Sequence, residues 1–118
     1  MYELINPDLI QHRADEWGGN EMVVEIINML IGEYDDRIVL IEKAVKSRDF
    51  KGIKEEVHSI KSNLYFFIER ESGFGTKIQQ LENKGRDADA NDLDQLFDYF
   101  KANSELTMKE LSQVIKEL

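Results

Sequence analysis

The chain has 118 residues and no cysteine, so it is of single-domain size and has neither a disulfide framework nor a thiolate metal site. Its residues are 42% hydrophobic and 33% charged with one proline, which excludes collagen-like and strongly disordered classes. The net charge is -9, from 24 acidic and 15 basic residues. Because the basic residues are scattered, this charge argues against nucleic acid as a partner.

Apolar residues recur at spacings of three and four along most of the chain, and no segment shows the alternation of a strand. The first helix is predicted to begin with Asn6 as N-cap and Pro7 at the first helical position, and to end at Trp17, before two glycines. The second is predicted to begin with Asn20 as its cap and to run to the break at residues 47–49. Its length predicts partner helices of similar length.

The third helix is predicted to begin after Asp49 and to run to about Glu71. The fourth is predicted from Phe74 or Thr76 to residues 84–85. A polar loop over residues 86–91 then precedes a last helix. The predicted fold is all-α, an antiparallel four-helix bundle with a short additional N-terminal helix, and residues 1–118 form one domain. The residues expected to be buried include Leu9, Ile10, Ala14, Trp17, Val23, Ile27, Leu30, Ile53, Val57, Ile60, Leu64, Ile78, Leu81, Phe97, Phe100, Leu106, Leu111 and Val114.

His58 and Lys61 lie one turn apart on the third predicted helix. With Lys54, Ser62 and Tyr65 they share a face displaced from the apolar stripe, so we expect both His58 and the Lys61 ammonium to be exposed. A neutral imidazole nitrogen is a nucleophile toward phosphorus near pH 7, and the product gains about two negative charges that an adjacent ammonium can stabilise. The spacing alone is also compatible with two ordinary surface residues.

The segment His58-Ser59-Ile60-Lys61-Ser62-Asn63 resembles the phosphoacceptor motif of the histidine-containing phosphotransfer (HPt) domain, typically His-x-Leu/Ile-Lys-Gly. The resemblance extends to the segments over residues 18–20 and 44–49, to the pair Leu81-Glu82 and to a turn at Gly85-Arg86, and it covers most of the chain.

The resemblance implies a phosphorelay intermediate that shuttles a phosphoryl group between a sensor histidine kinase or a receiver aspartate and another response-regulator receiver domain. His58 is then the phosphoacceptor, Lys61 stabilises the phosphate, and Lys54, Ser62 and Tyr65 belong to the docking surface. It also implies that the chain has no cofactor of its own, since the receiver brings the aspartate and Mg²⁺.

Three positions depart from the HPt pattern. Ser62 replaces the usual glycine, and Ile68 stands where a second glycine is common. The spacing to Leu81-Glu82 is also about two residues longer, which suggests that Gly73 and Gly75 make the turn. Tyr65 and Phe66 follow Ser62 in the sequence. Tyr65 either alters the docking surface or lies at its rim, and Phe66 is expected in the core.

Two other functions are compatible with parts of the sequence. One is a non-phosphorylated adaptor of the same fold, which docks on a receiver or kinase domain and regulates it. The other is a metal-carboxylate bundle enzyme, which requires a Glu-x-x-His pair on each of two helices, whereas the sequence has one, Glu55 to His58. No run of ~20 apolar residues predicts a membrane span, and we expect a free-standing, cytoplasmic monomer.

Overall fold

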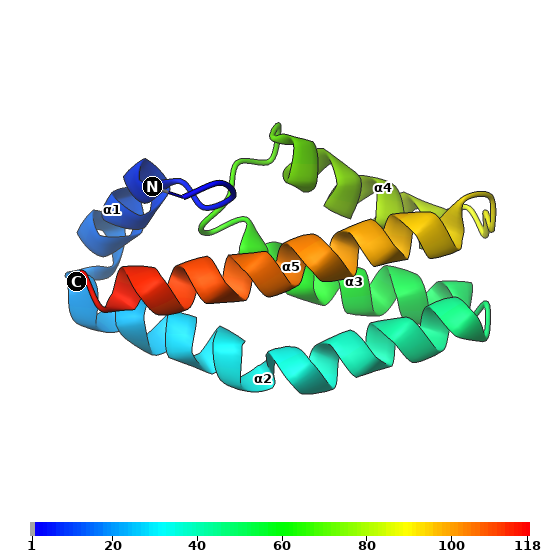
Figure 1. The fold of residues 1–118 in the computed structure, drawn as a ribbon, viewed down its shortest axis with the longest axis horizontal. Coiled ribbons are helices and arrows are strands. Elements are labelled where there is room, and N and C mark those ends of the chain that lie inside the picture. Colours follow the sequence, from blue (N-terminus) through cyan, green and yellow to red (C-terminus); the bar gives the residue numbers. More distant parts are fainter. Residues whose placement is uncertain (1) are drawn as a thin grey trace.

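The computed structural model describes residues 2–118, which form five helices and no strand (Figure 1). The helices are α1 (Pro7–Trp17), α2 (Asn20–Lys46), α3 (Phe50–Leu64), α4 (Gly73–Arg86) and α5 (Leu93–Ile115). The all-α bundle with a short first helix, predicted from the apolar spacing, is confirmed. None of these helices combines the length and the apolar composition that crossing a bilayer requires.

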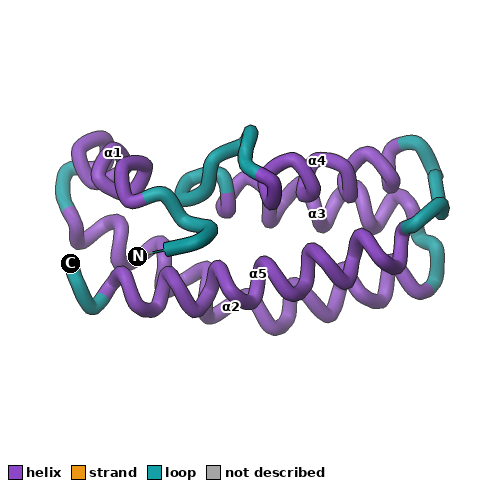
Figure 2. The backbone as a smooth tube through the Cα atoms, turned by 45° about the horizontal axis from the view of Figure 1, so that its top comes forward, coloured by secondary structure: helices purple, strands orange, loops and turns teal. Residues whose placement is uncertain are grey.

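The two longest helices, α2 and α5, run the length of the molecule, which measures 41 × 25 × 22 Å. Figure 2 shows α3 and α4 over one half of this pair and α1 over the other half. The segments before α1 and between α3 and α4 fill the space between α1 and α4 (Figures 1 and 2). The bundle is therefore complete at one end, and at the other end loops and α1 take the place of two helices.

Side-chain caps begin three of the helices, two of them where the sequence predicts them. Asn6 accepts a hydrogen bond from the Asp8 amide, and Asp49 accepts one from the Gly52 amide. Ser72 caps α4, so this helix begins at Gly73, one residue earlier than predicted. The predicted cap at Asn20 is wrong: Asn20 is the first residue of α2, and Gly19, with φ of 136°, precedes it without a side-chain cap.

The predicted end of the third helix at Glu71 is also wrong, because α3 ends at Leu64. Beyond it the chain turns and crosses the segment that precedes α1. Ile5 and Ile68 form an isolated antiparallel bridge, and the Asn6 amide donates to the Phe67 carbonyl at 2.8 Å. Phe67 and Ile68 are both buried, so this long-range contact, rather than local helix propensity, determines where α3 ends.

The turn expected at Gly85-Arg86 lies two residues further on, at residues 87–88, because both Gly85 and Arg86 are inside α4. A Cβ at Gly85 would lie 2.6 Å from the Lys54 amide nitrogen, so the missing side chain allows α3 and α4 to approach closely. Gly73 and Gly75 likewise belong to the first turn of α4 and have no positive φ. A Cβ at Gly75 would overlap the Glu69 carbonyl, which packs the preceding loop against the helix.

The core follows the predicted apolar stripes, with four exceptions. Leu9, Trp17 and Leu106 are half-buried rather than buried, and so is Phe66, which was expected in the core. The large side chains that are fully buried come from every helix except α1, and from the segment after α3. They are Phe67, Phe100, Ile27, Leu30, Ile41, Ile53, Ile60, Leu64, Ile68, Ile78, Leu81 and Leu93.

Candidate functional site

His58 and Lys61 of α3 both contact one carboxylate oxygen of α4, Glu82 Oε1. The distance is 3.2 Å from His58 Nδ1 and 2.8 Å from Lys61 Nζ. Lys61 Nζ also donates to Gln79 Oε1 at 3.0 Å. Gln79 and Glu82 are three residues apart, so one face of α4 supplies both acceptors.

Exposure separates the two α3 residues. The His58 side chain is 65% exposed, as predicted, but the Lys61 side chain is only 14% exposed. The prediction that the Lys61 ammonium is exposed is therefore wrong. The sequence placed Lys61 off the core stripe of its own helix, but α4 covers that face and provides the counter-charge.

The neighbours of Glu82 keep it ionised. Desolvation raises the pKa of Glu82, but the hydrogen bond and charge of Lys61, together with His58, outweigh it and hold the pKa below its usual value. An ionised carboxylate can only accept hydrogen bonds, so His58 Nδ1 must donate to Oε1. In the neutral imidazole this leaves Nε2 as the unprotonated nitrogen with an available lone pair.

A groove runs from His58 along the end of α3 and the loop that follows. It is lined by His58, Lys61, Ser62, Tyr65, Phe66, Arg70, Glu71, Thr76 and Gln79. The Arg70 guanidinium lies 5.3 Å from the centre of the Tyr65 ring, which is within cation–π range. The groove therefore combines one exposed imidazole, two cationic side chains and an aromatic wall.

The three residues predicted for docking lie on the same side of α3 as His58. Lys54 is exposed one turn before His58. Ser62 is exposed, and its hydroxyl donates to the His58 carbonyl at 3.1 Å. Tyr65 is half-buried at the groove, and its hydroxyl donates to the Gly75 carbonyl at 2.9 Å, so the phenol joins the loop wall to α4.

Burial raises the pKa of Tyr65, and the nearby Arg70 opposes this effect. The hydroxyl therefore stays protonated as the donor to Gly75. Tyr65 is half-buried and lines the groove, a position that fits both interpretations of this residue. Ile68, whose bulk replaces a glycine in the HPt pattern, is buried and does not line the groove.

Sequence reasoning missed three members of the site, Glu82, Gln79 and Arg70. The signal for Glu82 was its place beside Leu81 in the pattern that resembles HPt domains. Gln79 follows from Glu82 by helical spacing. Arg70 had no signal, because it was placed inside the third helix, whereas it lies in the loop that returns along the groove.

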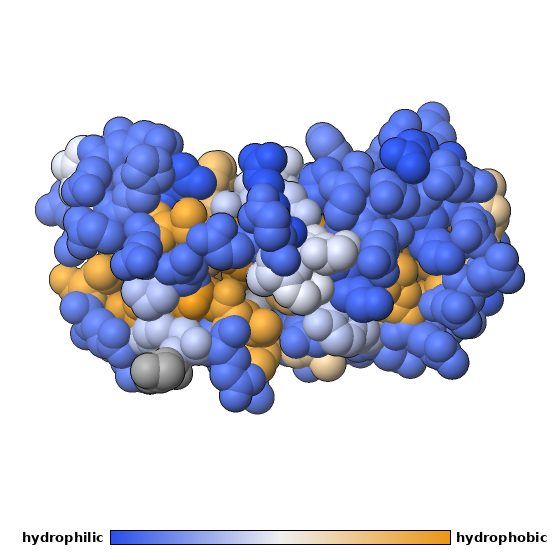
Figure 3. All heavy atoms as spheres, turned by 90° about the horizontal axis from the view of Figure 1, so that it is seen from above, coloured by the Kyte–Doolittle hydropathy of each residue, from blue (hydrophilic) through white to orange (hydrophobic). Residues whose placement is uncertain are grey.

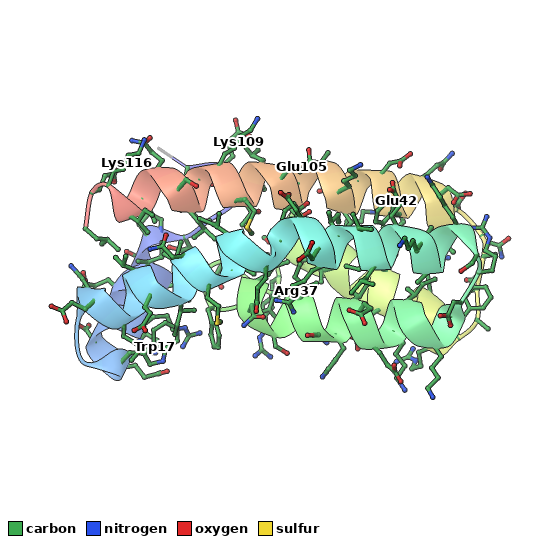
Figure 4. The ribbon with its side chains drawn as sticks, turned by 90° about the horizontal axis from the view of Figure 1, so that it is seen from below. Trp17, Arg37, Glu42, Glu105, Lys109 and Lys116 are labelled. Atoms are coloured by element: carbon green, nitrogen blue, oxygen red, sulfur yellow. The ribbon has the colours of Figure 1, made fainter. Side chains whose placement is uncertain are left out.

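An apolar patch lies on α2. Met22, Ile26 and Met29 share one face of α2, and the side chain of Met29 is 49% exposed. Figure 4 shows Trp17 beside the N-terminal half of α2. The Trp17 ring meets the Phe66 ring edge-on at 5.1 Å, and Phe66 lines the groove. By contrast, the face formed by α1 and α4 is mostly hydrophilic (Figure 3).

Within residues 2–118, no three His, Asp or Glu side chains are grouped so that they could hold a metal ion. In particular Glu55, the one Glu-x-x-His partner of His58, pairs with Lys51 at 3.9 Å on the exposed face of α3. Comparisons with protein-family models, with curated proteins and with solved structures found no match.

Proposed function

We propose that the chain is a phosphorelay intermediate that accepts and donates a phosphoryl group on His58. The observation that carries this proposal is the shared contact of His58 Nδ1 and Lys61 Nζ with Glu82 Oε1. It leaves the opposite ring nitrogen, on a largely exposed side chain, available to a donor. The motif around His58, which resembles that of HPt domains, supports the same role.

The chemistry follows from this arrangement. His58 Nε2 attacks the phosphorus of an aspartyl phosphate, the new N–P bond forms, and the P–O bond to the aspartate breaks with its electron pair remaining on the leaving carboxylate. The imidazole keeps its Nδ1 proton and becomes cationic. Glu82 stabilises this cation, as a buried carboxylate stabilises the imidazolium of a catalytic histidine. The transfer to the next receiver is the reverse of this step.

Two cations would stabilise the phosphoryl group. Arg70 lines the groove beside Tyr65, and its planar guanidinium suits a phosphate. Lys61 Nζ is held by Glu82 and Gln79, so we propose that its charge stabilises the phosphoryl group from this fixed position. The chain would need no metal of its own, because the partner receiver would supply the aspartate and Mg²⁺.

The partners we propose are a response-regulator receiver domain and a sensor histidine kinase. We propose that the groove and the apolar patch of α2 both belong to the docking surface, with Lys54 and Ser62 at its edge. A large exposed methionine on such a surface suits contact with a partner, because the flexible thioether adapts to the shape it meets.

To test the proposal, the purified chain would be incubated with a phosphorylated receiver or an active sensor kinase. We expect label that is stable in alkali and labile in acid on the unaltered chain, and none on His58→Gln. His12→Gln is the matched control and should be labelled normally, because His12 lies on α1, paired with Glu16 at 3.5 Å. Label on His58→Gln, or no label from any cognate donor, would refute the proposal.

The alternative is an adaptor that docks on the same partner without accepting phosphate, and it is favoured by the exposed apolar side chains of Met22 and Met29. It predicts that a receiver binds His58→Gln as tightly as the unaltered chain while neither is labelled.

Substitution of Met29 tests the docking surface. Met29→Glu adds a charge to the patch without touching the His58 network, so transfer from a receiver should slow by about tenfold or more, as expected for a central contact residue. Phosphorylation by a small donor such as phosphoramidate should be unchanged. Val39→Glu, at another exposed apolar position of α2, is the control. Equal loss in both variants would argue against the patch as the docking surface.

A further inference from the structure

Glu110 of α5 is a buried carboxylate that binds backbone instead of a cation. Its side chain is 8% exposed, and its oxygens accept from the amides of Glu3, Leu4 and Ile5, each at 3.0 Å. Among residues 2–118, no lysine, arginine or histidine forms an ion pair with it. A buried charge of this kind is tolerated only when hydrogen bonds to it are complete, so the three amides are essential to it.

These amides belong to residues 2–6, which we name the strap. Segments outside the helices of a small domain are ordered only when they are tied down, and the strap is tied on two sides. On one side it is held by Glu110. On the other it is joined to the loop after α3, through the Ile5–Ile68 bridge, the bond from the Asn6 amide to the Phe67 carbonyl and a 2.7 Å bond from Asn6 Nδ2 to Glu69.

The same loop, residues 65–72, forms the wall of the His58 groove. Tyr65, Phe66 and Arg70 face the groove, while Phe67 and Ile68 between them are held by the strap and the core. Helix α1 reinforces this contact, because Arg13 Nε donates to the Phe66 carbonyl at 3.3 Å and its guanidinium stacks on the Phe66 ring at 5.4 Å. Figure 1 shows the strap between α1 and the loop that leads into α4.

We propose that Glu110 is a positioning residue for the His58 site: by holding the strap against α5, it fixes the loop that shapes the groove where a partner docks. The role of the groove in docking rests on the proposed function, but the mechanical link from Glu110 to the loop does not. Glu110 touches none of the reacting atoms.

Amide hydrogen exchange measured by NMR on the full chain tests the link. Glu110→Gln keeps the side-chain shape but replaces one acceptor oxygen by a donor. We expect protection to fall by about tenfold or more at Leu4, Ile5 and Asn6, and to fall with it at Phe67, Ile68 and Ser72 of the loop. The amides of α2 should keep their protection. Glu105→Gln, an exposed position on the same helix, is the matched control and should change neither segment.

Retained protection in the loop when the strap has lost its own, or equal loss in all helices, would overturn the proposal. If Glu110→Gln does not fold, the same exchange measurement is made on Glu69→Ala. This substitution removes only the bond from Asn6 Nδ2 to Glu69, and a loss of protection in the strap without a loss in the loop would again overturn the proposal. A functional readout is added with a phosphorylated receiver. The receiver concentration for half-maximal transfer should rise several-fold in Glu110→Gln, while the rate with phosphoramidate stays unchanged.

An unchanged half-maximal concentration would overturn the positioning role even if the loop is looser. Hydrogen exchange can be measured without phosphoryl transfer, so the two proposals can fail separately. If no donor labels the chain, the proposed function is refuted. If strap and loop still lose protection together in Glu110→Gln, the link between Glu110 and the loop stands.

Discussion

Glu82→Gln should slow the phosphorylation of His58 by a receiver by about 100-fold or more. The amide has no charge to stabilise the imidazolium that forms when Nε2 attacks, and its NH₂ group can leave the wrong tautomer in place. Rapid quench of the labelling reaction would measure the rate. Glu55→Gln is the control, because Glu55 is exposed on α3 and contacts Lys51 instead of His58. A change of less than about twofold would show that Glu82 does not assist His58.

The same substitution should lower the free energy of unfolding at pH 7 by about 1–3 kcal/mol, because it leaves the Lys61 ammonium, 14% exposed, without its counter-charge. The pKa of Glu82 is lowered in the folded state from an ordinary value of 4.5, so its stabilisation is present above that pH and is lost as the pH falls through the lower folded pKa. Denaturant unfolding at several pH values should therefore show the difference between the two proteins narrowing in acid. A difference that widens below pH 4.5 would contradict the lowered pKa.

Lys61→Ala should both slow transfer and destabilise the fold, because the Lys61 side chain is 14% exposed and paired with Glu82, instead of exposed as predicted from the sequence. It leaves the carboxylate of Glu82, 15% exposed, without its strongest partner, and the free energy of unfolding should fall by about 2–3 kcal/mol. Transfer should slow by about 10- to 100-fold, the effect of losing one positioned cation or donor. Denaturant unfolding and quenched labelling measure the two effects.

Lys51→Ala is the control for Lys61→Ala, because Lys51 is 85% exposed on the same helix and, within residues 2–118, pairs only with Glu55. Its unfolding free energy should change by less than about 0.5 kcal/mol. In a double-mutant cycle, Lys61→Ala and Glu82→Ala should be coupled by about 1 kcal/mol or more. Additive effects would mean that the contact between these two residues contributes little.

The sequence predicted those parts of the fold that depend on local chemistry. Asn6 with Pro7, and Asp49, begin helices because a side-chain oxygen satisfies a free amide, and this signal is local. The end of α3 could not be predicted in this way. It depends on Ile5 and Asn6, which lie more than fifty residues earlier and pair with the chain at Phe67 and Ile68.

The same distinction between local and long-range effects applies to the candidate site. His58 was correctly placed on an exposed face because its own helix determines that face. The burial of Lys61 depends on which neighbouring helix lies beside it, and α4 is brought there by the loop and by the absence of a side chain at Gly85. Glu82 is 24 residues beyond His58, so helical spacing on α3 could not reveal their contact.

The most direct test of the central claim is to identify the ring nitrogen that carries phosphorus. The chain, labelled with nitrogen-15 at histidine, would be phosphorylated by a receiver or by phosphoramidate and examined by phosphorus and nitrogen NMR. We predict one phosphohistidine, with phosphorus on Nε2 of His58 and the Nδ1 proton retained toward Glu82. Phosphorus on Nδ1, on His12 or on no histidine would contradict the account.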